Sequence, residues 1–165
     1  MELEYIYQDD LTFIGFYTKI KLDEGYQKCP EFWEKEYSLR FAHLWQTMKP
    51  ENAIEQAVFD DDIGTFAICE DHEQSFDYWI AGLYRGGEVP EGLHLYTIKA
   101  SKWAIFKTKG PLPSSLQQLN DYIIKEWFEK EGKALGARLN LMLEKYSMGD
   151  SSSPEYESEI WVPLR

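Results

Sequence analysis

The sequence predicts an α+β fold in which two strand-helix-strand-strand units form an antiparallel sheet, with both helices on one face. Two long segments show the 3.6-residue hydrophobic period of an amphipathic helix. Shorter segments rich in β-branched and aromatic residues precede and follow each of them. This order of element types occurs twice, although no residue-level repeat is visible. The 165 residues suit a single domain over 1–165 with a substantial core.

The first unit is expected to cover about residues 9–85. It begins with a strand at 11–21, LTFIGFYTKIK, which is dominated by β-branched and aromatic residues. An amphipathic helix follows at 31–49, where hydrophobic residues recur at spacings of three and four. Two apolar strands complete the unit, at 64–70 and 75–85.

The second unit is expected to cover about residues 92–165. Its first segment, 93–110, alternates well enough to be one bent strand or two short ones. The helical period returns at 111–132, and two further strands follow, at 137–146 and 156–163. If both helices cover one face of the sheet, a concave seam between the units on the other face is the expected ligand groove.

The charge balance excludes some partners. Lys and Arg number 17 against 29 Asp and Glu, which gives a formal net charge of −12. Such a chain repels nucleic acid and anionic membranes and favours cations. Aromatic residues make up 16% of the sequence, with 6 Trp and 11 Tyr. This content indicates either an aromatic-rich core or a pocket for flat ligands.

Cysteine and histidine spacing gives no motif for a metal or a cofactor. Cys29 and Cys69 form no close-spaced pair, which favours a reducing cytoplasm. His43, His72 and His94 are isolated in the sequence, so we expect no metal site. There is no P-loop or nucleophile elbow, no signal peptide, and no apolar run of about 18 residues that could span a membrane.

Two stretches resemble a known family. They are VPEGLHLYTIKASKWAIFKTKGPLP at 89–113 and EKYSMGDSSSPEYESEIWVPL at 144–164. Their order and spacing are similar to the bacterial GyrI-like small-molecule-binding domain, which is also the effector-binding domain of AraC-type and MerR-type regulators, including multidrug-sensing ones. The resemblance covers about residues 9–165. It implies two pseudo-symmetric units with a ligand in the groove between them, and a buried glutamate among aromatic rings that receives lipophilic cations.

By position, the resemblance makes Glu159 the first choice for that glutamate and Glu144 the second. The chain departs from the regulators because only about ten residues precede the first predicted strand, too few for a helix-turn-helix. The acidic balance also offers no electrostatic footprint for DNA. We therefore expect a stand-alone binding domain without direct nucleic-acid binding.

Side chains alternate between the faces of a strand, so Glu159 and Trp161 share a face. In the preceding strand, Leu139, Leu141 and Leu143 share one face. The strand faces that carry only aliphatic side chains are expected under the helices. The face that mixes acids with aromatic residues and a methionine is expected in the groove. That face carries Glu159, Trp161, Met142, Glu144 and Tyr146. A solvated face on which Glu159 pairs with a lysine or arginine is the alternative.

Three further aromatic side chains are candidates for the walls of the groove, and each could belong to the core instead. They are Trp103, Trp79 and Tyr17. The predicted function is the binding of a lipophilic, aromatic and cationic compound for sensing or sequestration. One alternative, which the resemblance to GyrI-like proteins also implies, is a hydrolase that opens reactive rings of toxic natural products, with Glu159 and Tyr146 as catalytic residues. Another is an inhibitor that contacts a DNA-binding enzyme such as gyrase; its protein partner is unknown.

Overall fold

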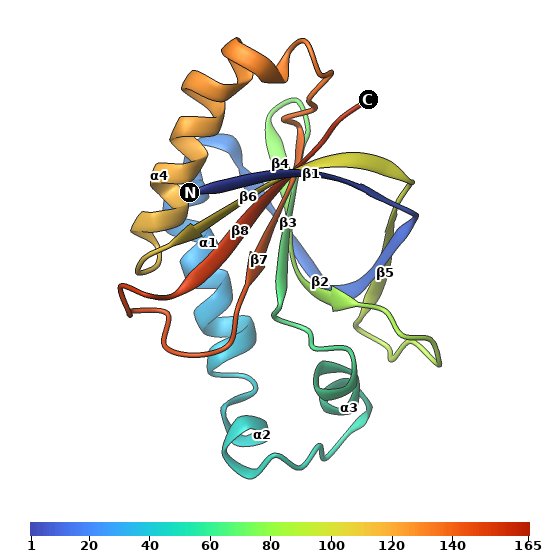
Figure 1. Cartoon of the computed structure of the whole chain (residues 1–165). Helices are drawn as coiled ribbons and strands as arrows, with labels where there is room; N and C mark the ends of the chain where they lie inside the picture. Colours follow the sequence, from blue (N-terminus) through green and yellow to red (C-terminus); the bar gives the residue numbers. More distant parts are fainter. The chain divides into compact units, whose positions relative to one another are not determined.

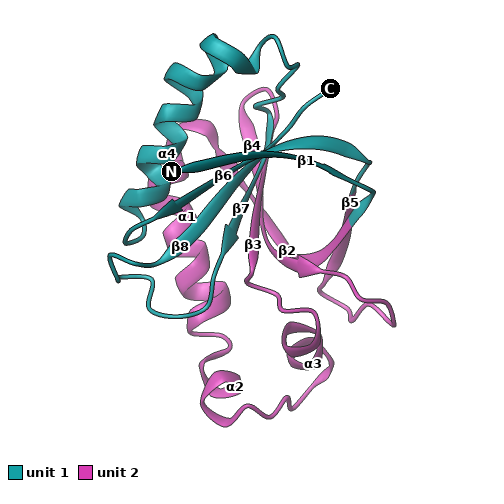
Figure 2. Cartoon of the chain, viewed as in Figure 1, with its two compact units in different colours: residues 1–11, 98–165 teal, residues 12–97 magenta.

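Eight antiparallel strands and four α-helices make up the chain, and they fall into two units (Figure 2). The computed structural model describes all residues from Met1 to Arg165. Unit 1 comprises residues 1–11 and 98–165, and unit 2 comprises residues 12–97. The predicted α+β class and the antiparallel pairing are confirmed.

Unit 1 contains four strands that neighbour one another in the order β1, β6, β8, β7. Their bounds are Glu2–Gln8 for β1, Ser101–Lys109 for β6, Leu141–Tyr146 for β7 and Glu157–Pro163 for β8. Helix α4 (Ser114–Tyr122) connects β6 to β7 and continues as a π-helical segment, Ile123–Gly132. β1 precedes the first strand that the sequence predicts.

The core of unit 1 lies between its helix and its sheet. α4 contacts β6 and β8, and Figure 1 shows it alongside these strands. Phe106 of β6 meets Trp127 of the π-helical segment edge to face, with ring centroids 4.9 Å apart. Ile160 and Val162 of β8 complete this cluster, together with Ala104, Leu116, Leu119, Ile123 and Leu164.

Unit 2 has the strand order β3, β4, β2, β5. The strands are β2 (Leu11–Lys21), β3 (Phe66–Asp71), β4 (Ser75–Leu83) and β5 (His94–Ile98). The helices are α1 (Gly25–Trp33), α2 (Ala42–Thr47) and α3 (Ala53–Asp60). The segment 93–110 therefore forms two strands, β5 and β6, rather than one bent strand.

The single helix predicted at 31–49 is wrong in its extent. α1 begins at Gly25, passes into a π-helical segment at Glu34–Ser38, and is followed by a turn before α2. The hydrophobic period hides this break because Phe41 in the turn and Leu44 in α2 are both buried. The sequence also does not predict α3, whose N-cap Asn52 accepts a hydrogen bond from the Glu55 amide at 2.8 Å.

The strand registers reveal a correspondence between the units that the sequence alone does not show. In unit 1, Phe106 lies opposite Ile160. In unit 2, Phe16 lies opposite Ile80, and it contacts Phe32 of α1 with ring centroids 5.7 Å apart. Each pair therefore marks the same position under the helix of its unit. Counting from these pairs aligns 16–19, FYTK, with 106–109, FKTK.

Candidate functional site

The register between β7 and β8 assigns side chains to the two faces of the unit 1 strands. Residues directly opposite each other in an antiparallel pair lie on the same face. Glu144 lies opposite Ile160, which belongs to the core under α4. Glu144 and Tyr146 therefore project toward the helix side. Leu143 lies opposite Trp161, and both project toward the side that α4 does not cover.

The predicted orientation of β7 is therefore wrong. Met142 and Tyr146 pack against the core on the helix side, whereas Leu143 is buried on the opposite side. Alternation separates the side chains into two sets but does not say which set faces the helix. Hydrophobicity does not decide it here, because the side away from α4 is itself buried: Trp103 and Ile105 are at most 2% exposed.

This correction also separates two residues that were predicted to act together. Tyr146 lies opposite Ser158, and Glu159 lies opposite Lys145. Glu159 and Tyr146 thus project from opposite faces, so the predicted catalytic pair cannot contact one small substrate. The face that carries Glu159 also carries Trp161 and Trp103, whose ring centroids lie 5.8 Å apart.

Two lysine residues lie beside Glu159 on the same face, although the Lys107 ammonium group is itself paired with Glu4 at 2.7 Å. Lys107 of β6 and Lys145 of β7 occupy the two positions opposite it. Its Oε1 accepts a hydrogen bond of 3.0 Å from Trp161 Nε1, and Lys145 Nζ lies 6.0 Å from the centre of a Trp161 ring. A cationic ligand at Glu159 would have to compete with these two ammonium groups.

Glu144 has a different environment. It is partly buried, and its Oε2 accepts a hydrogen bond of 3.2 Å from Tyr146 Oη. Burial raises the pKa of the Glu144 carboxyl group, the Tyr146 hydrogen bond acts in the opposite direction, and no cationic side chain contributes. No charge within the chain therefore compensates this carboxylate.

The helix side of β7 also offers apolar contact. α4 packs on β6 and β8, and β7 is the last of the four strands of unit 1. Met142, Glu144 and Tyr146 are accordingly only partly buried, while Ile160 on the neighbouring strand is fully covered. A thioether and a phenol thus flank a carboxylate at the margin of a hydrophobic core.

Two predicted ring residues come together in unit 2. Tyr17 lies opposite Trp79, and their rings stack with centroids 4.6 Å apart. They project away from α1, since the adjacent Phe16 contacts that helix. Trp79 is 5% exposed and Tyr17 is 47% exposed. Trp79 is therefore mainly a core residue, and Tyr17 presents its ring at the surface of the unit.

Sequence reasoning missed the neighbours of this pair. The Tyr96 ring of β5 lies 5.4 Å from Trp79, and its hydroxyl donates a hydrogen bond to Glu70 of β3. Burial raises the pKa of the Tyr96 hydroxyl, and the hydrogen bond and charge of Glu70 raise it further. His94 meets Tyr17 edge to face at 5.3 Å. These contacts depend on the position of β5 beside β2, which no motif in the sequence indicates.

The eight predicted ligand-binding residues therefore form three groups. Glu144, Tyr146 and Met142 lie on the helix side of unit 1. Glu159, Trp161 and Trp103 lie on its opposite side. Tyr17 and Trp79 lie in unit 2. The prediction of a groove between the units stays a prediction.

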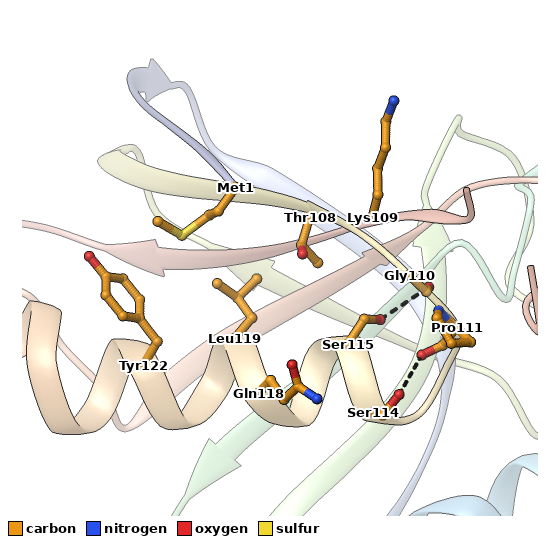
Figure 3. A pocket seen from close by; sticks show the side chains of 10 residues that line it. All are labelled: Met1, Thr108, Lys109, Gly110, Pro111, Ser114, Ser115, Gln118, Leu119 and Tyr122. Atoms are coloured by element: carbon orange, nitrogen blue, oxygen red, sulfur yellow. Dashed lines mark hydrogen bonds between the residues drawn. The ribbon is translucent and has the colours of Figure 1, made fainter. Parts of the chain in front are cut away.

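A pocket of about 340 Å³ opens in unit 1 between the end of β6 and the start of α4 (Figure 3). Its wall includes Thr108, Leu119 and Tyr122, with Met1 at one side. Ser115 Oγ donates a hydrogen bond of 3.2 Å to the Gly110 carbonyl at the turn into the helix. The pocket contains no carboxylate and none of the predicted ligand-binding residues, so it lacks the chemistry expected for a cation receptor.

None of the helices combines the length and the hydrophobicity that a bilayer crossing requires.

Comparison with curated proteins gives no match to the chain. Comparison with solved structures gives matches along the whole chain. SAV2435, solved with tetraphenylphosphonium bound, superposes with a TM-score of 0.78 at 20% identity, covering 100% of this chain and 94% of that one.

Two other solved structures share the fold. A putative bacterial transcription regulation protein from Staphylococcus aureus MU50 gives a TM-score of 0.73 at 21% identity, covering 100% of this chain and 99% of that one. The integron cassette protein VCH_CASS2, from the mobile metagenome of Vibrio cholerae, gives 0.62 at 15% identity, covering 99% and 95%.

The sequence itself matches the Cass2 family, described as integron-associated effector binding protein, over residues 4–164. This match covers nearly the whole chain, and the predicted GyrI-like, effector-binding character is confirmed. The chain belongs to the family of integron-associated effector binding proteins.

Proposed function

We propose that the chain binds a lipophilic, aromatic cation through Glu144 and uses this binding for sensing or sequestration. The observation that carries the proposal is a partly buried carboxylate whose pKa burial raises and which has a tyrosine hydroxyl, but no cationic side chain, beside it. The effector-binding family and the tetraphenylphosphonium bound to SAV2435 support the same ligand class.

The physical argument concerns an uncompensated charge. An ionised carboxylate that has lost part of its hydration gains more from a nearby cation than one in open water. A delocalised organic cation is weakly hydrated and brings its own apolar surface, which Met142 and Tyr146 can contact. A cation over the Tyr146 ring would add about 0.5–2 kcal/mol. Glu159 offers less, because Lys107 and Lys145 already occupy the positions opposite it.

Titration with tetraphenylphosphonium, followed by calorimetry, tests the proposal. We expect Glu144→Gln to weaken binding at least about tenfold, equivalent to about 1.4 kcal/mol. Glu159→Gln is the matched control, because it removes a carboxylate from the other face of the same sheet, and it should leave the affinity within about twofold. Tetraphenylborate, with the same shape and a negative charge, should not compete. Equal losses in both variants, or competition by tetraphenylborate, would remove Glu144 from the role of charge partner.

The affinity should also depend on pH. Burial raises the pKa of Glu144, and a bound cation favours the ionised form. Protonation therefore competes with the ligand, and affinity should fall as the pH is lowered through the raised pKa. In Glu144→Gln this dependence should disappear. A wild-type affinity that is flat or rises on acidification contradicts the assignment.

The Tyr146 hydrogen bond to Glu144 favours a second candidate function, hydrolysis of a reactive ring. A carboxylate with a raised pKa can act as a general base on water, and an adjacent phenol can protonate the leaving oxygen. Mass spectrometry after incubation of a strained epoxide in ¹⁸O-labelled water decides between the two functions. A hydrolase yields a labelled product that Glu144→Gln abolishes, whereas a binding protein returns the compound unchanged.

A further inference from the structure

The hairpin between β3 and β4 in unit 2 brings three potential metal ligands together. Glu70 of β3 lies opposite Asp77 of β4, and His72 stands in the turn that joins them. The turn is fixed by a hydrogen bond of 2.7 Å from the His72 amide to the Ser75 carbonyl. One ligand atom from each of the three side chains lies within 4.8 Å of the others.

We propose that Glu70, His72 and Asp77 bind one divalent transition-metal ion of the zinc type. His72 Nε2 lies 3.0 Å from Asp77 Oδ2 and 3.6 Å from Glu70 Oε1. Tetrahedral zinc with bonds of about 2.0–2.2 Å places its ligand atoms roughly 3.3–3.6 Å apart. The two distances from His72 Nε2 are therefore within a few tenths of an ångström of this spacing, and the ligand atoms of Glu70 and Asp77 lie no more than 4.8 Å apart.

Two features around the three side chains favour a metal-binding site over a surface cluster that binds no ion. Asp77 Oδ1 is buried and has no hydrogen-bond partner, so this carboxylate retains an unused acceptor. Glu70 Oε2 already accepts a hydrogen bond from Tyr96, which orients the carboxylate and leaves Oε1 toward His72. The His72 side chain is 45% exposed, so an ion can enter and keep water in the fourth position.

The competing state is an imidazolium of His72 paired with both carboxylates. Zinc requires the neutral imidazole and takes the place of that proton. His43 offers a matched control, because it is exposed and its Nε2 lies 3.1 Å from a single carboxylate, Glu51. A histidine with one carboxylate forms the same kind of ion pair but does not provide three ligands.

The experiment is a titration of the purified, chelator-treated protein with Zn²⁺ by calorimetry, and with Co²⁺ by visible absorption. We expect one equivalent to bind, with the intense absorption of tetrahedral cobalt. His72→Asn should lower the affinity at least tenfold, Asp77→Asn should also lower it, and His43→Asn should not change it. Circular dichroism confirms that each variant is folded. Absence of stoichiometric binding, or unchanged binding in His72→Asn, overturns the proposal.

Discussion

The two units share a strand order but differ at one position on the helix side of the sheet. This position lies opposite an isoleucine in each unit. In unit 1, Glu144 of β7 lies opposite Ile160. In unit 2, Ala67 of β3 lies opposite Ile80, and it is fully buried. The same frame therefore accepts a carboxylate or a methyl group. Since the methyl group satisfies the fold in unit 2, packing alone does not require the buried carboxylate in unit 1.

A second difference lies on β4 and β8. Val162 of β8 packs under α4, whereas the equivalent residue of β4 is Gly82. The chain after α3 crosses at this point: a Cβ on Gly82 would lie 2.0 Å from the Asp61 carbonyl oxygen. Unit 2 thus covers its sheet with backbone where unit 1 uses a side chain. The aspartates of this crossing are held by Arg85, whose amide donates to Asp61 Oδ1 at 3.0 Å.

The largest effect should follow from making unit 2 resemble unit 1. Ala67→Glu buries a carboxylate at a fully covered position, and the residue two places on is Cys69 rather than a tyrosine. We expect a loss of about 4 kcal/mol or more in the free energy of unfolding. Urea denaturation measures it. Ala67→Gln controls for volume and should cost less; equal losses would attribute the effect to packing rather than to charge.

Gly82→Ala should have the next largest effect. Its methyl group would overlap backbone atoms of Asp61 and Asp62, which cannot move aside like a flexible side chain. We expect a loss of about 3 kcal/mol in urea denaturation. Gly25→Ala, in α1, is the control: its Cβ would meet only the Phe76 ring, at 3.4 Å, and should be neutral or slightly stabilising. A tolerated Gly82→Ala would mean that the crossing after α3 is not packed tightly on β4.

The sequence predicted the extent of a strand well where the residue types along the strand form a clear pattern. The strand at 11–21 matches β2, and the strand at 156–163 matches β8 to within one residue. The sequence was misleading for β7. Both faces of the unit 1 strands are apolar, so the alternation of side chains does not show which face lies under the helix. The contact between Tyr96 and Glu70 depends on which strand β5 joins, and pairing between strands is a tertiary property that no local pattern contains.

The smallest effect should distinguish function from packing at Glu144 itself. The folded-state pKa of this carboxyl is raised, so the folded protein binds the proton more tightly than the unfolded chain does. Its contribution to stability is therefore lost as the pH rises through the raised pKa. Glu144→Gln should consequently raise the melting temperature at neutral pH, and at this chain length each kcal/mol of stability gained corresponds to about 2–4 °C. The gain should vanish well below the ordinary glutamate pKa of about 4.3, where the carboxyl is protonated in both the folded and the unfolded protein. Glu91→Gln, on an exposed loop, should change nothing.

If Glu144→Gln loses cation binding while it gains stability, Glu144 is retained for a ligand rather than for the fold. A variant that loses both would instead make Glu144 part of the architecture of unit 1.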